Sequence, residues 1–560
     1  MSCQYILLLI LLLVPLHANP LDDFRTSTRR QELINEAEAE RAKPTEQLPK
    51  ALLPSATSPP QPSSTTTYIS RIDIRNNTLL PSAELYYIRK PFENQLLSAS
   101  DIFRFIQTLQ NAYTVRGYTT TRVSLLPSDD PRILIVSIVE GRIGRLYTPQ
   151  NTWFDRVRLW QLFPINANDI ANDYTLRIGL SHVNRLSTPR ITTQLEPGIT
   201  VGETNILTTF TPTQKPWTLY ASFNNVSSHQ LTPSYLQLSG SHLLHVFDAW
   251  KLSYSHTINP MQNANSITLT TSIPLKRHLL SATVTQLTNN HYTKLYSDTA
   301  QVLHGTNQKM TLNSTYTLHT TGTMRATLIP SIGIKTNKSS QDGVPLYGQY
   351  FRQTVAGMSG TLAFFSPLSL TASIGFDKSV PWFNATVDDP ASDQTAEHYQ
   401  FEKWSATLRI AKQYHWPLLK TIASSASIHS QIMNTITQTS EHAILGGWYS
   451  VKGFNSTPKF GECHVVFTSE HMIPLSQYPV PWLKRRNIQL SFFGDGGIVF
   501  RPHGQKIPTT QSDQAYAIGG GLGIGFPLFG GQYDFKVAHG IAASFAIPGI
   551  ESSWSWTISF

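Results

Sequence analysis

WSWTISF, residues 554–560, places an aromatic or aliphatic residue at every second position, with Ser or Thr between. Because successive side chains of a strand point to opposite faces, this stretch predicts a strand with one apolar and one polar face. WSATLRI (404–410) and IQLSFFGDGG (488–497) alternate in the same way. One face suits lipid and the other suits water, which is the pattern of a transmembrane β-barrel strand.

This alternation dominates the chain from about Trp217 onward, where helical periodicity disappears. Roughly 345 residues, at about 21 per strand and connection, predict around sixteen antiparallel strands, the even number typical of bacterial barrels. A soluble β-sandwich also alternates, but its apolar face is covered by a second sheet. We therefore expect residues 214–560 to form an all-β transmembrane barrel.

Composition limits the chemistry that the chain can perform. Charged residues make up 14 % of its 560 residues, aromatic residues make up 11 %, and the net charge is +9. The two cysteines are Cys3, inside an apolar leader, and Cys463, so a mature chain would form no internal disulfide. We expect no catalytic residues, no metal site and no cofactor.

The first 67 residues divide into three segments. Residues 1–18 contain an apolar run and a small residue, Ala18, suited to cleavage, so they predict a signal peptide. Residues 19–43 favour a helix with few large apolar side chains, either a solvated helix or a polar plug in a water-filled lumen. Residues 44–67 are rich in Pro, Ser and Thr and predict an extended linker. Beyond the leader no run of 18 apolar residues occurs, so no transmembrane helix is expected.

Residues 68–142 predict a small α+β domain. YISRIDIRNN (68–77) alternates as a strand, and SASDIFRFIQTLQNAY (98–113) has helical spacing with a capping box at its start. Gly117 follows this helix where a left-handed residue is favoured, and two further strands complete the unit. The tetrapeptide Val115-Arg116-Gly117-Tyr118 is thus interpreted as a helix end. Residues 143–213 repeat the order of elements and predict a second domain of the same kind.

Two motifs in the barrel region carry a family resemblance. Val451-Lys452-Gly453-Phe454 precedes Phe493-Gly494-Asp495-Gly496-Gly497 by about 40 residues. Together with residues 173–206 and a first barrel hairpin at 222–248, these motifs resemble the outer-membrane transporters of two-partner secretion, the haemolysin and filamentous-haemagglutinin secretion proteins. Asn224-Asn225 in the hairpin departs from the common pattern of that family. The resemblance implies a plug helix, a linker and two periplasmic POTRA domains before a 16-stranded barrel. It also identifies the first motif as the tip of the long loop 6.

The expected site joins the two motifs. The two-residue period places Phe493, Asp495 and Gly497 on the lumen face of one strand, with Phe492 toward lipid. A loop 6 folded inward on Gly446, Gly447 and Gly453, and wedged by Trp448, Tyr449 and Phe454, would bring Lys452 near Asp495. Lys452 stands where the family has arginine, so the latch should be weaker or differently shaped. In the alternative interpretation, Lys452 is an exposed loop lysine and Asp495 is a hydrated carboxylate in the lumen. The predicted site residues are Val451, Lys452, Gly453 and Phe454 in loop 6, and Phe493, Asp495 and Gly497 in the wall.

The resemblance implies export of a large secreted protein, an adhesin, haemolysin or contact-dependent toxin with an N-terminal secretion domain. POTRA domains in the periplasm would capture the unfolded protein at a sheet edge. The expected further partners are outer-membrane lipid and, through Phe560, the barrel-assembly machinery, and no nucleic acid is expected. The candidate edge comprises Thr119, Thr120, Thr121, Arg122, Val123, Ser124 and Leu125.

Three other functions compete with export. A barrel-assembly or translocation-assembly factor would be expected to carry three or more POTRA units and no tethered helix. A passive porin needs no periplasmic domain. A barrel enzyme would need a serine nucleophile beside a histidine, whereas His442, His464 and His471 are scattered and no nucleophile elbow lies near them. The glycine-rich run 519–525 has strand texture and no following Lys-Ser, which argues against a phosphate loop.

Overall fold

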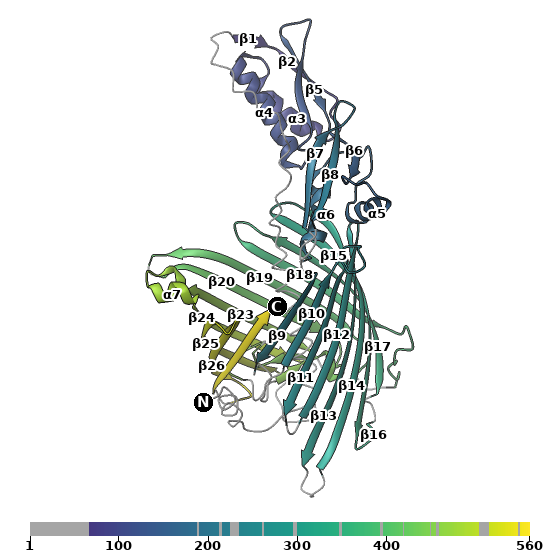
Figure 1. Cartoon of the computed structure of the whole chain (residues 1–560), viewed down its shortest axis with the longest axis vertical. Helices are drawn as coiled ribbons and strands as arrows, with labels where there is room; N and C mark the ends of the chain where they lie inside the picture. The colour runs from purple at the N-terminus through teal and green to yellow at the C-terminus, as the bar shows by residue number, and fades with distance from the viewer. Residues whose placement is uncertain are drawn as a thin grey trace.

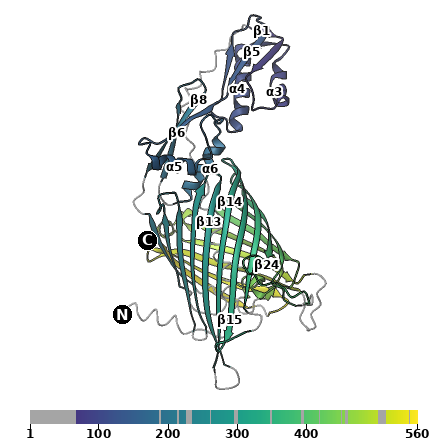
Figure 2. The same ribbon diagram turned by 90° about the vertical axis from the view of Figure 1, so that its right-hand side faces the viewer.

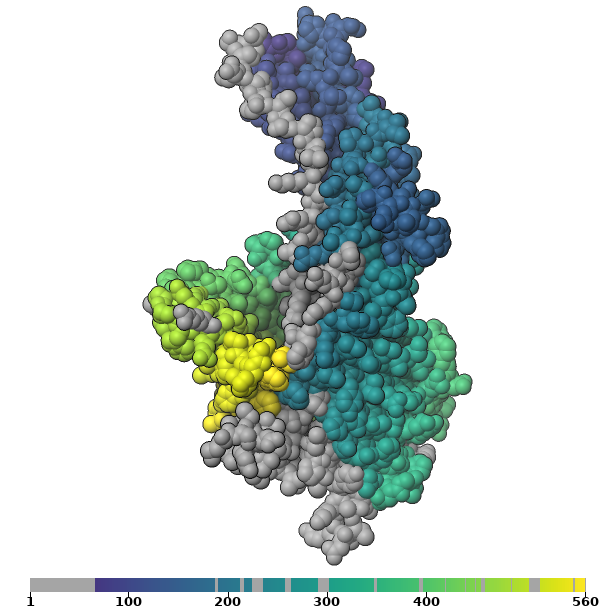
Figure 3. Space-filling model, in the orientation of Figure 1, coloured from purple at the N-terminus to yellow at the C-terminus, as the bar shows by residue number. Residues whose placement is uncertain are grey.

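A computed structural model describes residues 66–186, 190–211, 216–224, 234–259, 262–294, 300–346, 350–391, 396–417, 419–448, 450–454, 459–502, 514–546 and 549–559. The predicted signal peptide (1–18), the predicted plug helix (19–43) and most of the predicted linker lie outside these residues. So do Tyr449 and Phe560. In Figures 1, 2 and 3 two small domains extend in line from one end of a large barrel.

The barrel of the described chain closes with sixteen long antiparallel strands, as predicted. Closure occurs where β27 pairs with β9, from Ser555 opposite Asn224 to Ser559 opposite Tyr220. A two-residue strand, β16 (Val344–Pro345), extends one hairpin. The strands are β9 Trp217–Asn224, β10 Ser234–Ser241, β11 Ala249–Asn259, β12 Gln262–Leu275, β13 His278–Lys294, β14 Ala300–Thr320, β15 Met324–Gln341, β17 Phe351–Phe364, β18 Ser369–Val380, β19 Glu402–Trp416, β20 Lys420–Met433, β23 Cys463–Pro474, β24 Gln489–Phe500, β25 Gln514–Leu528, β26 Gly531–Ala543 and β27 Ile550–Ser559.

The apolar sides of these strands face outward, in the sense that the alternation predicts. On β19 the alternate residues Trp404, Ala406, Leu408 and Ile410 are exposed, while Ser405, Thr407 and Arg409 between them are partly covered. An exposed apolar band around a closed barrel is the surface that a bilayer covers. Among the described residues, no helix has the length and apolarity needed to cross a membrane.

The first small domain has a three-stranded sheet with the order β2-β5-β4. β2 runs parallel to β5, and β4 pairs with β5 antiparallel from the other side. The capping box predicted at Ser98 and Asp101 begins α4, whose Phe105, Leu109 and Tyr113 form the core. The elements are β1 Thr66–Ile69, β2 Arg71–Arg75, α3 Ser82–Arg89, η2 Lys90–Phe92, β3 Gln95–Ser98, α4 Ala99–Val115, β4 Arg122–Leu126 and β5 Ile133–Val139.

Two local details of this domain differ from the predictions. The single strand expected over 68–77 is divided at Ser70, and its first part, β1, pairs with β3 instead of joining the main sheet. β1 begins at Thr66, two residues inside the predicted linker. Strand pairing therefore starts earlier than the Thr-rich composition indicated.

The second small domain repeats this architecture, with sheet order β6-β8-β7. Side chains cap both of its helices: Thr152 forms a capping box with Asp155, and the Asn172 side chain accepts from the Tyr174 amide. The elements are β6 Arg142–Tyr147, α5 Trp153–Leu162, α6 Asp173–Asn184, β7 Arg190–Pro197 and β8 Glu203–Thr211.

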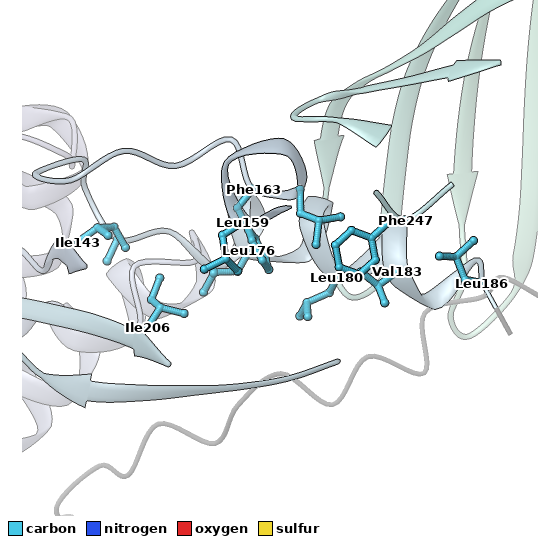
Figure 4. Packing of buried hydrophobic residues seen from close by; sticks show 11 residues of the cluster. Ile143, Leu159, Phe163, Leu176, Leu180, Val183, Leu186, Ile206 and Phe247 are labelled. Atoms are coloured by element: carbon cyan, nitrogen blue, oxygen red, sulfur yellow. The ribbon is translucent and has the colours of Figure 1, made fainter. Parts of the chain in front are cut away.

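The second domain docks on the barrel through a shared core. Phe247, in the turn between β10 and β11, is fully buried among Leu180, Val183 and Leu186, as Figure 4 shows. The His182 imidazole donates to the Lys276 carbonyl at 2.9 Å, and Arg185 donates to the Ser272 hydroxyl at 2.8 Å. A barrel turn thus completes the core of the second domain, which fixes that domain on the rim.

Candidate functional site

Loop 6 connects β20 to β23 and folds into the barrel. Its described residues form a short hairpin of β21 (Ala443–Leu445) and β22 (Lys459–Gly461). Val451 and Phe454 at the tip are fully buried and pack with Leu445 against Val466 and Val499 of the wall. Apolar contact with the wall holds the loop tip inside the barrel.

The loop tip brings Lys452 to Asp495. Lys452 Nζ lies 2.9 Å from Asp495 Oδ2, and the Asp495 side chain is fully buried. The Lys452 backbone amide also approaches Oδ2, at 3.5 Å. Asp495 Oδ1 has no hydrogen-bond partner among the described residues, so the lysine engages one of the two carboxylate oxygens. This single-point contact is what a lysine in place of an arginine is expected to make.

Phe493 completes this corner of the lumen. The Lys452 ammonium lies 4.7 Å from the centre of the Phe493 ring, and Lys536 Nζ lies 5.7 Å from the same ring. Trp448 packs against Phe493 and Ala538. Lys536 is itself paired with Glu470 at 2.6 Å. The predicted residues Val451, Lys452, Phe454, Phe493 and Asp495 are therefore brought together.

Glycines let the loop approach the wall backbone. A Cβ on Gly519 would lie 2.0 Å from the Lys452 carbonyl oxygen, and one on Gly540 would lie 2.8 Å from the Gly453 oxygen. Gly453 has φ +92° and sits against the backbone of His539 and Gly540. Gly497, the last predicted residue, makes room for Leu445. Gly519 belongs to the run 519–525, which was predicted to be an ordinary strand. Its missing side chain leaves room for the loop tip.

A second ion cluster holds the start of loop 6. Glu441, in η3 (Thr439–Glu441), lies 3.2 Å from Lys335 of β15 and 3.2 Å from Lys403 of β19. All three side chains are largely buried. The loop therefore offers an anion to one wall and a cation, Lys452, to β24. Glu441 was not predicted, because its partners Lys335 and Lys403 are remote in sequence and the only local signal is an acidic residue inside loop 6.

A buried pair lies at the base of the same loop. His442 Nε2 is 3.1 Å from Glu462 Oε1, and the Glu462 side chain is fully buried. Neither residue belongs to a predicted motif. In the described residues, no group of three or more His, Cys, Asp or Glu side chains is arranged to hold a metal ion.

The predicted POTRA edge is only partly an edge. β4, from Arg122 to Leu126, is the outer strand of its sheet, so Arg122, Val123, Ser124 and Leu125 lie where a further strand could add. Thr119, Thr120 and Thr121 precede the strand, and Thr121 is fully buried. The Thr119 hydroxyl donates to Asp173 of the second domain at 2.8 Å. The prediction that these three residues belong to the edge was wrong, because they precede β4, and Thr119 contacts the second domain.

The tetrapeptide Val115-Arg116-Gly117-Tyr118 also contacts the second domain. Gly117 has φ +86°, as expected at this helix end, and its carbonyl accepts from the Asp173 amide at 2.9 Å. The Tyr174 hydroxyl donates to the Val115 carbonyl at 2.7 Å. This first copy therefore connects two domains, whereas the second copy lies in the barrel.

Comparison with known proteins identifies relatives over most of the chain. A family model described as haemolysin secretion/activation protein ShlB/FhaC/HecB matches residues 202–526, and a model of the ShlB-type POTRA domain matches residues 67–141. The outer membrane transporter CdiB of Dickeya dadantii strain 3937 is 24 % identical over 469 residues, which cover 80 % of this chain and 79 % of that protein.

Two solved structures have the same fold. The structure of CdiB from Escherichia coli gives a TM-score of 0.81 at 20 % identity and covers 97 % of this chain and 100 % of that one. The structure of CdiB from Acinetobacter baumannii gives a TM-score of 0.75 at 16 % identity and covers 98 % and 100 %. The likeness extends over both small domains and the barrel.

Proposed function

Because this chain belongs to the haemolysin secretion/activation protein family ShlB/FhaC/HecB, we propose that it exports one large secreted protein by displacing loop 6 from the barrel lumen. The chain is an outer-membrane transporter of two-partner secretion, and its POTRA domains lie in the periplasm. The cargo we propose is an adhesin, haemolysin or contact-dependent toxin that carries an N-terminal secretion domain.

The observation that carries the mechanism is the buried pair of Lys452 and Asp495. A charge pair that bridges a loop and a wall can be exchanged for contacts with polar groups of a passing chain. Charged hydrogen bonds are also strong enough to define one resting position. In our proposal the loop occupies the lumen at rest and leaves the wall as the unfolded cargo threads through.

Capture of the cargo is assigned to the edge of β4. Its outer side is unpaired in the sheet β2-β5-β4, and Leu125 and Leu126 are exposed beside it. An extended segment can add to such an edge through backbone hydrogen bonds. A photo-crosslinking residue at Leu125 should trap the secretion domain, and one at the exposed Tyr87 of α3 should not. Equal trapping at both positions would contradict the assignment.

The decisive experiment measures secretion of the cargo encoded beside this gene. Asp495→Ala and Lys452→Ala each remove the defined resting position of loop 6 and the charge pair that we propose is exchanged with the cargo, so export should be strongly reduced, while the barrel keeps its heat-modifiable gel mobility. Lys378→Ala is the matched control, because Lys378 makes a 2.7 Å ion pair with Glu402 in which both side chains are substantially exposed. Exposed pairs contribute little, so its export should equal wild type. Unchanged export in both latch variants would remove the latch from the mechanism, and unchanged export in a gene deletion would remove the cargo assignment.

A further inference from the structure

Helix α5 of the second POTRA domain carries an exposed aromatic face. Trp153, Phe154 and Trp160 are 68 %, 67 % and 55 % exposed, and Val157 lies on the same side of the helix. The opposite side buries Leu159 and Leu162 in the domain core. Monomeric soluble surfaces seldom gather several large aromatic side chains without a partner. The helix is thus apolar on two sides, and the domain core covers one of them.

The helix lies along the rim of the barrel. Arg158 Nε donates to the His245 carbonyl in the β10–β11 turn at 2.9 Å. One turn later, Gln161 Nε2 donates to the Val246 carbonyl at 2.9 Å and to the Pro274 carbonyl, at the end of β12, at 2.8 Å. Contacts with two neighbouring hairpins place α5 across their tips. Figures 1 and 2 show α5 at the side of the second small domain, next to the end of the barrel.

The outward surface of these hairpins is the lipid-facing band. Ile267 and Leu269 of β12 are exposed, as are Leu280 and Val284 on the neighbouring strand β13. Ile273, opposite Leu280, is one residue from Pro274, which contacts α5. The apolar band therefore extends to the end of β12, where the strand contacts α5.

Positive charge accompanies this face. Arg156 is exposed between the aromatic residues, and Lys276 Nζ lies 5.0 Å from the centre of the Trp160 ring. Aromatic side chains favour the membrane interface, and nearby Lys and Arg attract anionic headgroups. Exposed aromatic residues beside cations are the combination that a phospholipid surface recognises.

We propose that α5 is an interfacial helix that rests on the periplasmic leaflet of the outer membrane. Trp153, Phe154, Val157 and Trp160 lie among the headgroups, and Arg156 and Lys276 contact lipid phosphates. The membrane then becomes a third support for the second POTRA domain, besides the shared core and the hydrogen bonds to the rim. This inference rests on the membrane location of the barrel and not on the export mechanism.

The test uses the full chain in vesicles of phosphatidylethanolamine and phosphatidylglycerol. Phe154→Cys is labelled with an environment-sensitive fluorophore, and Tyr87→Cys, on exposed α3 of the first domain, is the matched control. The unsubstituted chain is the blank, because its Cys463 is buried. Unboiled gel mobility verifies that both variants are folded.

We expect the probe at position 154 to be blue-shifted and to lose most of its emission to headgroup-level nitroxide lipid, with little loss to aqueous iodide. The probe at position 87 should show the reverse. Quenching by iodide and not by nitroxide lipid at position 154 would overturn the proposal. Protection from iodide that develops only when the cargo's secretion domain is added would also overturn it, and would assign the aromatic face to the cargo.

Discussion

At the scale of single residues, the unpaired oxygen of Asp495 distinguishes this latch. Lys452 reaches Oδ2, and Oδ1 has no hydrogen-bond partner among the described residues. A guanidinium can donate to both oxygens in parallel, which an ammonium cannot do. We therefore expect Lys452→Arg to hold loop 6 more firmly than the native lysine.

Channel recordings of the Lys452→Arg and Asp495→Asn variants measure how firmly the latch holds loop 6. Removing the charge of Asp495 leaves a buried ammonium unpaired, and breaking one partner of a buried pair costs about 3–5 kcal/mol. In planar bilayers, Asp495→Asn should spend more time in open-channel states than wild type, and Lys452→Arg should spend less. If the Lys452→Arg variant spends as much time open as wild type, the second oxygen plays no part in holding the loop.

Glu441 should act as an independent anchor. It lies between Lys335 and Lys403, so Glu441→Gln removes the carboxylate that both ammonium groups contact, while Lys403 keeps Asp377 at 3.5 Å. Removing one member of a buried charge cluster is destabilising by several kcal/mol, so we expect open-channel occupancy to rise by roughly tenfold or more. Single-channel recording checks this, with the exposed pair partner Glu402→Gln as control. Indistinguishable traces for the two variants would contradict a role for Glu441.

At the scale of elements, the fit of loop 6 depends on missing side chains in the wall. A Cβ on Gly519 would meet the Lys452 carbonyl at 2.0 Å, whereas one on Gly494 would meet only the Ser469 hydroxyl, at 3.7 Å. Gly519→Ala should therefore displace the loop tip, and Gly494→Ala should leave it in place. Cysteine crosslinking between loop tip and wall measures the displacement. Equal crosslinking in both variants would show that the loop adjusts around the added methyl group.

The strands and helices were predictable because their signals are local. Alternation along 404–410 and the capping box at Ser98 depend on neighbours within a few residues. The loop 6 motif was found through family resemblance, since nothing local links Lys452 to Asp495, 43 residues away. Thr119 to Thr121 were predicted to belong to a strand edge, whereas β4 begins at Arg122 and Thr119 contacts Asp173 of the second domain.

At the scale of the whole molecule, the interface between the second POTRA domain and the barrel contains a histidine, His182, that is kept neutral. Desolvation lowers the pKa of His182 from its ordinary 6.5 to about 4, and the nearby cations Arg185 and Arg325 act in the same direction. Its imidazole donates to the Lys276 carbonyl of the barrel turn. The docked state therefore disfavours the imidazolium, while an undocked, solvated His182 would take up a proton near pH 6.5.

Acidification should accordingly loosen the POTRA stack. Between pH 6.5 and 4 the undocked state binds more protons than the docked state, so docking is fully stable above pH 6.5 and weakens as pH falls toward 4. The loss can reach ~3 kcal/mol, from about 1.4 kcal/mol per pKa unit. Spin-label distances between the second POTRA domain and the barrel rim should broaden at pH 5 relative to pH 7.5. His182→Gln keeps a side-chain donor for Lys276 but cannot titrate, so its distances should not change with pH. Equal broadening in His182→Gln would assign the acid sensitivity to other groups.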